Sequence, residues 1–302
     1  MRHKIFWLLF LCAFFYCFYE NRPVSVNVRG KTPEQDFVIR MPYKDKKRLD
    51  SLFRHLCLVE LWSYTLIGSK PVTFTGYRKP SSSSLSDPMC FVRNLRKSWR
   101  WDTWLKYQHY FANSRFQVFV DPDPRWDTDT WMTIVDTEHF AQIVQEHQQD
   151  FRLVLGNEAV DPQAFIEEAK HRPFISDILK AHDGLIGTIL GYGRNNAWLF
   201  YDREQGKDTQ LTSVWEPDLL DQMVTQLSKK DWSLEPWELS DLYYPSFAAV
   251  QDSEETVQLK QIYQISREKI IRYYEGQDFV EATLSLFAGA DPESHFNWTL
   301  AI

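Results

Sequence analysis

Residues 44–77, KDKKRLDSLFRHLCLVELWSYTLIGSKPVTFTGY, place a helical repeat directly before a strand-like repeat. Apolar residues recur at helical spacing from Leu49 to Trp62, which predicts an amphipathic helix that ends near Gly68. Residues 71–77, PVTFTGY, then alternate between apolar and polar as the two faces of a β-strand do. The stretch therefore predicts a fold that contains both helices and strands.

The rest of the chain continues this mixture, with helices predominating. Short strands are predicted at 36–41, 115–120 and 131–136. The predicted helices cover residues 91–111, 137–155, a segment that begins at Asp161-Pro162, 174–182, 184–203, 216–230, 253–275 and 277–288. Because strands and helices do not alternate regularly, we expect a helix-dominated α+β fold, an irregular helical body with a few short strands or hairpins.

The N-terminus has the layout of an export signal or membrane anchor. Residues 5–19, IFWLLFLCAFFYCFY, carry no charge and follow the basic Arg2 and Lys4. The run is about 22 Å long as a helix, which is short for a hydrocarbon layer of roughly 30 Å. We interpret residues 1–22 as a signal or membrane-anchor helix, 23–35 as a tether, and 36–302 as a single soluble domain. Cleavage, lipidation and retention of the anchor all stay open.

The charge of the body argues against one class of partner. The chain carries 34 basic and 41 acidic residues, and residues 1–22 hold three of the basic ones but a single acidic one. An acidic body lacks the cations that displace phosphate counterions, so no nucleic-acid partner is expected. Of the four cysteines, Cys57 and Cys90 lie in the body, where either a disulfide or two free thiols fits their spacing.

An acidic loop is the candidate metal site. Asp121 and Asp123 follow the apolar strand FQVFV, and Asp127 and Asp129 come soon after. Carboxylates at the end of a strand can hold a divalent cation that bridges substrate phosphates. The pattern of an apolar strand followed by D-x-D resembles metal-dependent nucleotide-sugar glycosyltransferases, in which both aspartates matter. The alternative is an exposed turn, because Asp and Pro both favour turns.

A basic and aromatic segment is the candidate binding surface. Its residues are Arg93, Arg96, Lys97, Trp99, Arg100, Trp101 and Trp104. Cations beside tryptophan suit anionic lipid headgroups or stacked sugars. The alternative is a helix with one charged face and one face packed through its tryptophans.

A glycine-rich segment and two histidines complete the polar candidates. Gly187 and Gly191 have the G-x-x-x-G spacing that allows close helix packing, and we expect Arg194 and Asn195 to lie near any site beside them. His139 and His147 are too far apart on one helix for a shared metal, so they are expected to be surface or packing residues. The sequence contains no complete catalytic motif and assigns no cofactor.

Residues 55–77 and 185–201, HLCLVELWSYTLIGSKPVTFTGY and LIGTILGYGRNNAWLFY, resemble uncharacterised membrane-anchored proteins of chlamydia-like intracellular bacteria. This resemblance implies a bacterial envelope location and no known activity. We expect a membrane-tethered or exported binding protein of the cell envelope. The membrane would be contacted through residues 5–19, the body would lie outside the cytoplasm, and the partners would be proteins. The alternatives are a divalent-metal-dependent transferase or hydrolase at Asp121 and Asp123, and a sugar-binding module.

Overall fold

The computed structural model describes most of the chain after the apolar N-terminal run. The described residues are 19–78, 88–112, 114–122, 129–156, 160–216 and 237–295. Residues 5–18 of the predicted anchor, and most of the predicted helix at 216–230, lie outside them.

The elements of the first half bring strands and helices together in the predicted order. They are β1 (Pro23–Val28), η1 (Pro33–Gln35), β2 (Phe37–Pro42), α2 (Tyr43–Arg54), η2 (His55–Val59), α3 (Ser63–Leu66), β3 (Val72–Arg78), α4 (Pro88–Tyr107), η4 (Gln108–Phe111), β4 (Phe116–Pro122) and β5 (Asp129–Asp136).

The second half is almost entirely helical. Its elements are α5 (Thr137–Glu146), α6 (Gln148–Leu155), α7 (Pro162–Ala169), η5 (Phe174–Ile178), α8 (Asp183–Ile189), α9 (Arg194–Glu204), β6 (Thr212–Ser213), η6 (Leu239–Asp241), β7 (Ala248–Ala249), α11 (Glu254–Tyr274), α12 (Phe279–Phe287) and η7 (Pro292–His295). The protein is therefore a helix-dominated α+β fold, as the sequence predicts.

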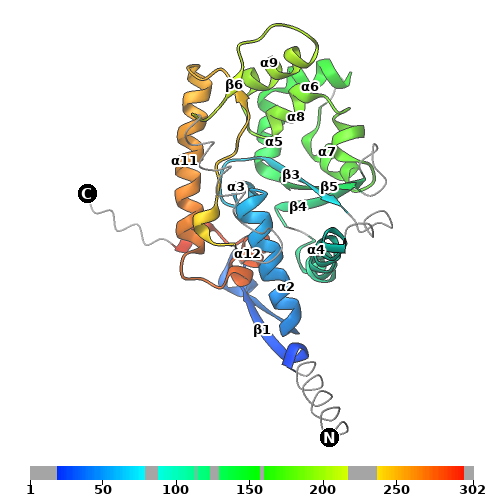
Figure 1. The fold of residues 1–302 in the computed structure, drawn as a ribbon, viewed down its shortest axis with the longest axis vertical. Coiled ribbons are helices and arrows are strands. Elements are labelled where there is room, and N and C mark those ends of the chain that lie inside the picture. Colours follow the sequence, from blue (N-terminus) through cyan, green and yellow to red (C-terminus); the bar gives the residue numbers. More distant parts are fainter. Residues whose placement is uncertain are drawn as a thin grey trace, which may run out of the picture.

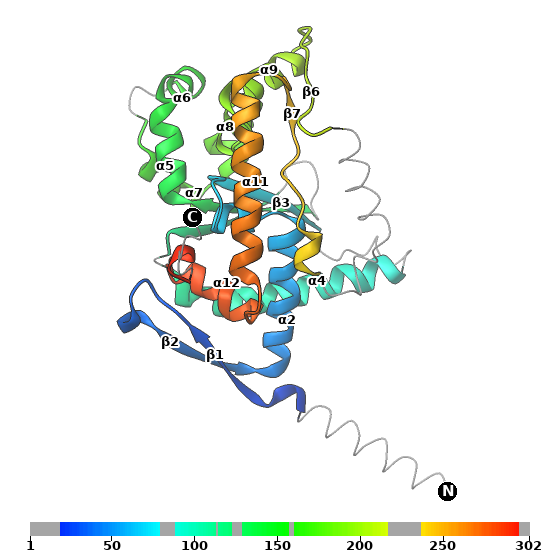
Figure 2. The same cartoon turned by 90° about the vertical axis from the view of Figure 1, so that its left-hand side faces the viewer.

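A three-stranded antiparallel sheet, ordered β3-β5-β4, separates two hydrophobic cores. Along the central strand β5, Met132 and Ile134 belong to one core and Val135 to the other, because successive side chains point to opposite faces of a sheet. The first core holds α2, η2, α3, α4 and α12, and the second holds α5, α6, α7 and α8 (Figure 1). Helix α11 runs past the elements of both cores (Figure 2).

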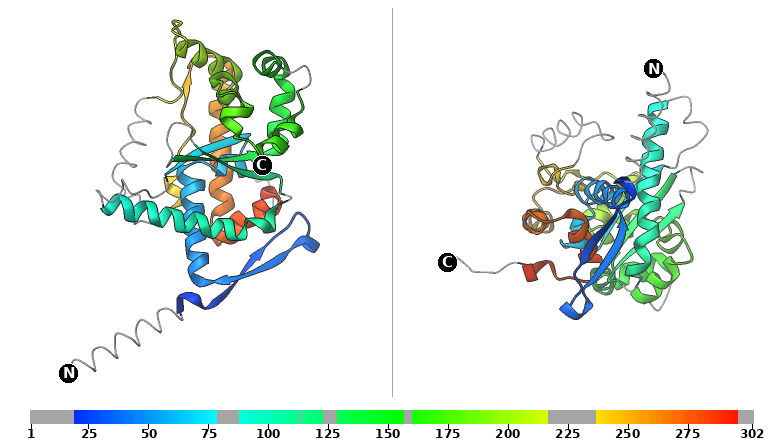
Figure 3. Two further views of the ribbon diagram at one scale, coloured as in Figure 1. Left: turned by 90° about the vertical axis from the view of Figure 1, so that its right-hand side faces the viewer. Right: turned by 90° about the horizontal axis from the view of Figure 1, so that it is seen from below.

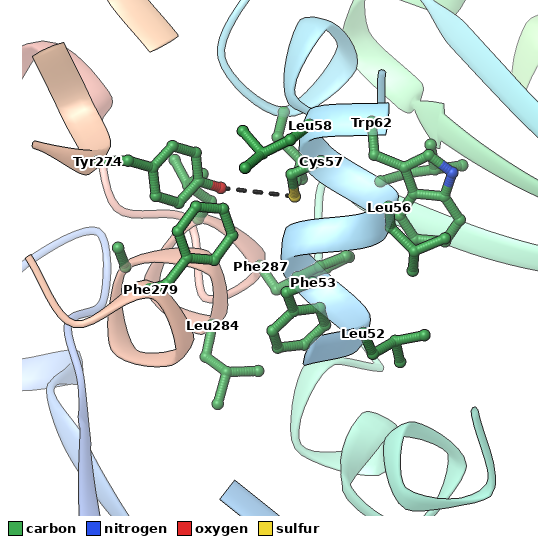
Figure 4. Close-up of a cluster of buried hydrophobic side chains, with 14 of the residues drawn as sticks. Leu52, Phe53, Leu56, Cys57, Leu58, Trp62, Tyr274, Phe279, Leu284 and Phe287 are labelled. Atoms are coloured by element: carbon green, nitrogen blue, oxygen red, sulfur yellow. Dashed lines mark hydrogen bonds between the residues drawn. The ribbon is translucent and has the colours of Figure 1, made fainter. Parts of the chain in front are cut away.

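The first core is centred on the π-helical turn η2 and helix α12 (Figure 4). Cys57 is a free, fully buried thiol, and the Tyr274 hydroxyl donates a hydrogen bond to its Sγ at 3.7 Å. Burial raises the pKa of the Cys57 thiol to about 12. Since the thiolate is the reactive form, Cys57 is a packing residue.

The long helix predicted from residue 44 is interrupted. Helix α2 ends at Arg54, η2 follows, and Leu61 takes a left-handed φ of 63° before the short helix α3. Such a conformation costs roughly 1–2 kcal/mol for a residue with a side chain. The turn places Trp62 and Tyr64 inside the first core, where both are almost completely buried. Burial of these rings offsets the backbone cost.

The segment predicted as a tether belongs to the body. Strands β1 and β2 form an antiparallel hairpin, with Pro23 paired to Pro42 and Val28 to Phe37. Val26 and Val28 are buried in the first core, and the backbone N–H of Arg29 donates to Ser285 Oγ of α12 at 2.9 Å. Apolar residues of the segment are buried at every second position, as in a strand with one face on the core. The segment is therefore part of the folded body despite its Pro and Gly content. Figures 2 and 3 show the hairpin beside α12 and α4 lying across α2.

Several predicted helix boundaries are confirmed. Asp136 and Asp161 cap α5 and α7 with their carboxylates, and α11 ends just before Gly276. The N-cap of α11 is Ser253, so the helix begins one residue later than the predicted start at residue 253. Two predicted helices are each divided, 137–155 at His147 and 184–203 between α8 and α9. The second break occurs where Gly191 and Gly193 both adopt positive φ.

Candidate functional site

The basic and aromatic segment is divided between the surface and the core. Trp101 and Trp104, predicted to be surface-binding residues, are buried on the side of α4 that faces the first core. That prediction is wrong for these two rings: Trp104 packs against Phe53 and Phe287, with ring centroids 5.5 and 4.9 Å away. The alternative of a helix with a tryptophan-packed face describes them correctly.

The remaining described members of the segment are less buried than those two rings. Trp99 is exposed, with the Arg48 guanidinium 5.8 Å from its ring. Lys97 and Arg100 are half-buried and, together with Trp101, line a small hollow of about 30 Å³. His55 and Glu60 line it too, with His55 Nε2 3.2 Å from Glu60 Oε1. The backbones of Arg93 and Arg96 lie in α4, and their side chains are outside the described part of the structure. The described members are therefore divided between the exposed ring of Trp99, this small hollow and the buried ring of Trp104.

The acidic loop is described only at its two ends. Asp121 is buried at the end of β4, where its Oδ2 accepts the backbone N–H groups of Phe174 at 2.9 Å and Ile175 at 3.4 Å. Burial raises the pKa of Asp121. Asp123 and Asp127 lie outside the described residues, as does the side chain of Asp129. Metal binding at this loop stays a prediction, while Asp121 has a structural role at the start of η5.

Replacing Asp121 should affect stability whether or not a metal is present. We expect Asp121→Ala to lower the free energy of unfolding by about 2 kcal/mol, because it leaves two backbone N–H groups without an acceptor. Asp121→Asn should cost less, since the amide oxygen can still accept. Urea denaturation with and without Mn²⁺ measures both. A stabilisation by Mn²⁺ that disappears in Asp121→Asn would contradict a purely structural role and support the metal site.

A cleft of about 490 Å³ opens between α5 and α11. Helix α5 lines it with His139, Gln142, Ile143 and Glu146, and His147 at the junction of α5 and α6 continues the same face. Helix α11 lines it with Glu255, Gln258, Leu259, Ile262 and Tyr263. In both helices these residues follow the spacing of a single helical face. Figure 2 shows the two helices side by side with α8 behind them. The cleft thus has two mixed walls, each with apolar and hydrogen-bonding side chains.

The floor of the cleft is held by the turn between α8 and α9. The carboxylate of Glu255 accepts the backbone N–H groups of Asn195 at 3.1 Å and Asn196 at 3.2 Å, and so caps α9 from another helix. A Cβ on Gly193 would lie 2.5 Å from Glu255 Cδ, so only glycine permits this approach. Arg194 lines the cleft, as expected near the glycines, and forms two short hydrogen bonds to Asp150.

The two predicted glycines act differently in this region. A Cβ on Gly187 would lie 2.7 Å from the Cβ of Ala197, so the close packing predicted for Gly187 is confirmed as contact between α8 and α9. Gly191 instead belongs to the turn and lines the cleft, with a φ of 76°.

An aspartate–histidine pair stands at one wall of the cleft. Asp136 is fully buried and receives two hydrogen bonds from Arg115, at 2.7 Å from Nε and 2.6 Å from Nη2. His139 Nδ1 lies 3.0 Å from the same carboxylate. Burial acts to raise the pKa of Asp136, but the hydrogen bonds and charges of His139 and Arg115 outweigh it and hold the pKa below its ordinary value. Asp136 thus links Arg115 to the first turn of α5, the helix that lines this wall of the cleft.

A buried lysine lies beneath the floor. Lys70 is only 3% exposed, yet its neighbours Ser69 and Pro71 both line the cleft. Its Nζ lies 5.2 Å from the centroid of the Tyr192 ring, and Lys70 forms no ion pair with any residue in the described ranges. Burial lowers the pKa of Lys70 to about 7. A substantial fraction of this amine is therefore uncharged at neutral pH.

Comparisons with known proteins give no relationship from which a function follows. No protein-family model matches the chain, and neither the curated proteins nor the solved structures contain a significant match. Within the described ranges, no helix has the length and apolar character to cross a bilayer, and no three or more His, Cys, Asp or Glu residues are grouped as metal ligands.

Sequence reasoning did not identify this cleft. His139 and His147, which the sequence predicts to be surface or packing residues, both line one wall of it. The useful signal was the polar face of the predicted helix, where His139, Gln142 and Glu146 recur at helical spacing. Lys70 lies in a short S-K-P connection, and nothing in that local pattern indicates burial.

Proposed function

We propose that this chain is a binding protein whose α5–α11 cleft takes a small organic ligand with both an apolar part and hydrogen-bonding groups. The observation that carries the proposal is the cleft itself, whose volume of about 490 Å³ falls in the range typical of small-molecule sites. Ile143, Leu259 and Ile262 supply apolar surface, and the polar side chains of the two walls fix orientation.

Rigid supports around the cleft favour binding. Asp136 caps α5, and Glu255 links α11 to the first turn of α9. The bidentate pair of Arg194 and Asp150 joins the α8–α9 turn to α6. A site held in place before the ligand arrives loses less conformational entropy on binding.

We further propose that the body is tethered to a membrane through residues 5–19 and lies outside the cytoplasm. The first described residues support this arrangement. The Arg22 guanidinium lies 4.1 Å from the Tyr19 ring and 4.5 Å from the Tyr43 ring, and tyrosines and basic residues are typical of a membrane interface. Strand β1 and helix α9 lie at opposite ends of the molecule (Figure 1). A tethered body would therefore hold its cleft away from the bilayer.

Blocking the cleft should abolish ligand binding. We expect 1-anilinonaphthalene-8-sulfonate, which has an apolar ring system and an anionic group, to bind the purified body saturably with enhanced fluorescence. Ile262→Trp should weaken this binding at least tenfold, because Ile262 lines the cleft. Ile265→Trp is the matched control, since Ile265 is exposed on the same helix and is not among the cleft residues. Equal binding by the parent and both variants would contradict the proposal.

A further inference from the structure

We propose that the base of the body is a membrane-docking face whose cations bind the headgroups of anionic phospholipids. This inference rests on the proposed tether of residues 5–19 and names a second contact with the same bilayer. The face surrounds the first two turns of α2, and we name it the basal collar. Its members are the cations Arg22, Lys44, Lys47, Arg48 and Lys106 and the rings of Tyr19, Tyr43 and Trp99.

The end of the apolar run is fixed to the start of α2. The backbone N–H of Tyr43 donates to the carbonyl of Arg22 at 2.9 Å. Tyr19 is the last residue of the apolar run, and its ring meets the ring of Tyr43 edge to face with the centroids 5.4 Å apart. A bilayer that holds the run would therefore lie beside the first turn of α2.

Helix α4 adds residues from a distant part of the chain to the collar. The Arg48 guanidinium lies 5.8 Å from the centroid of the Trp99 ring, and Lys106 Nζ lies 2.8 Å from Asp45 Oδ2. In the view from below, α4 lies beside the start of α2 (Figure 3). The collar is thus built by the fold from residues 19–22, α2 and α4.

The collar is basic, although the chain as a whole is acidic. Three carboxylates lie among its five cations, whereas the chain carries 34 basic and 41 acidic residues. These carboxylates belong to Glu20, Asp45 and Asp102. An excess of positive charge at one end of an acidic body favours an anionic surface as its partner.

Two of the carboxylates leave the collar only partly neutralised. Asp45 is buried and is shared between Lys106 at 2.8 Å and Arg48 at 4.0 Å. Glu20 lies 3.8 Å from Lys47 Nζ. Among the described residues, Arg22 and Lys44 form no ion pair. These two cations are therefore available to a phosphate group.

The cations at the start of α2 oppose the usual preference of a helix. Positive charge is unfavourable near a helix N-terminus, because the peptide dipoles leave a partial positive charge there. Lys44, Lys47 and Arg48 nevertheless lie in the first two turns, and the side chains of Lys47 and Arg48 are 59% and 39% exposed. A face that met only water would gain nothing from this arrangement, whereas an anionic bilayer supplies the opposite charge.

Exposed aromatic rings lie between these cations. Tyr19 and Trp99 are 46% and 47% exposed, and the guanidinium groups of Arg22 and Arg48 lie 4.1 and 5.8 Å from their respective ring centroids. Tyrosine, tryptophan and basic side chains are typical of the bilayer interface, where the rings enter the headgroup layer. Local cation–π pairing explains the contacts themselves, but it does not explain why they lie beside the end of the apolar run.

Lysine footprinting tests the proposal on the full-length protein. The protein is reconstituted into vesicles of phosphatidylcholine alone, or of phosphatidylcholine and phosphatidylglycerol in equal parts. A membrane-impermeant N-hydroxysuccinimide ester labels the accessible amines. Peptide mass spectrometry then compares Lys47 with Lys207, which is 65% exposed and follows α9 at the opposite end of the molecule (Figure 1). We expect the ratio of Lys47 to Lys207 labelling to be at least fivefold lower in the anionic vesicles, because headgroups cover the Lys47 amine.

Reversing the charge of two neighbours should remove this protection. Lys44→Glu/Arg48→Glu leaves Lys47 in place, and its labelling ratio should return to the value in phosphatidylcholine, because each cation near an anionic surface strengthens binding by about fivefold. The matched control is Lys170→Glu/Arg172→Glu, which reverses two exposed cations beside α7 and should leave Lys47 protected. Loss of protection in both variants would overturn the assignment to the collar.

Vesicle flotation separates this inference from the proposed tether. If the protein floats with both kinds of vesicle and the labelling ratio is the same in both, the docking face is wrong and the tether stands. If the protein floats with neither, both proposals fail. If it floats with the anionic vesicles alone and Lys44→Glu/Arg48→Glu releases it, the collar binds lipid and the tether proposal fails.

Discussion

Lys70→Met should stabilise the protein by about 4 kcal/mol at pH 7. The pKa of this amine is lowered to about 7 by burial, whereas a lysine in an unfolded chain titrates near 10.4. Each unit of difference corresponds to about 1.4 kcal/mol that the folded state loses by burying the amine. Methionine has nearly the same length and no charge to desolvate. Urea denaturation of the parent and the variant measures the difference.

The effect should depend on pH in one direction. Because the folded pKa lies below the unfolded pKa, between about pH 7 and pH 10 the unfolded chain binds a proton that the folded protein does not. The stability of the parent therefore gains from this group as the pH rises, and the advantage of Lys70→Met shrinks toward zero near pH 10. Below pH 7 both states are protonated, and the advantage is largest.

An exposed lysine provides the control. Lys47→Met changes a side chain that is 59% exposed, so it should alter the free energy of unfolding by no more than about 0.5 kcal/mol at any of these pH values. A Lys70→Met variant that is less stable than the parent, or whose advantage is independent of pH, would contradict the assignment of Lys70 as a buried amine without a counter-ion.

Local signals were sufficient for most of the helices and strands. The Asp161-Pro162 start of α7, the end of α11 before Gly276 and the alternating β3 strand were all predictable, because a cap, a left-handed glycine and a period of two act within a few residues. Gly187 was predictable as a point of close helix packing for the same reason. These features depend on backbone chemistry that the sequence displays directly.

The candidate site was not predictable because it joins distant parts of the chain. His139 on α5 and Ile262 on α11 share one cleft, yet more than a hundred residues separate them, and no local pattern indicates that the two helices lie side by side. The burial of Lys70 likewise depends on Tyr192, which the fold brings to it. The tether was mispredicted because Val26 and Val28 become core residues only when β1 pairs with β2 and packs on α12.

The tryptophans of α4 show how far composition alone can mislead. Trp99 and Trp104 lie five residues apart and belong to the same basic segment, but one is 47% exposed and the other 2%. The helix turns by about 100° per residue, so a spacing of five rotates a side chain well away from the face that its neighbour occupies. Only the position of the core beside α4 decides which ring is buried.

We therefore expect a large loss of stability from one tryptophan substitution and a small loss from the other. Trp104→Ala should lower the free energy of unfolding by about 3–5 kcal/mol, because it removes a ring that packs against Phe53, Phe111 and Phe287 and leaves a cavity. Trp99→Ala should cost no more than about 0.5 kcal/mol, since its ring is largely in solvent. Urea denaturation of the two variants, with dye binding in the cleft as a check of folding, measures both.

The same two variants also test which tryptophans of α4 are available to bind a partner. If Trp104→Ala were as stable as the parent, the assignment of that ring to the first core would be wrong, and the segment would again be a candidate surface. If Trp104→Ala unfolds more readily, as expected, any loss of partner binding in it has a structural cause. Trp99→Ala is then the informative variant, because its ring is exposed on α4 beside Arg48 and can be removed without disturbing the core.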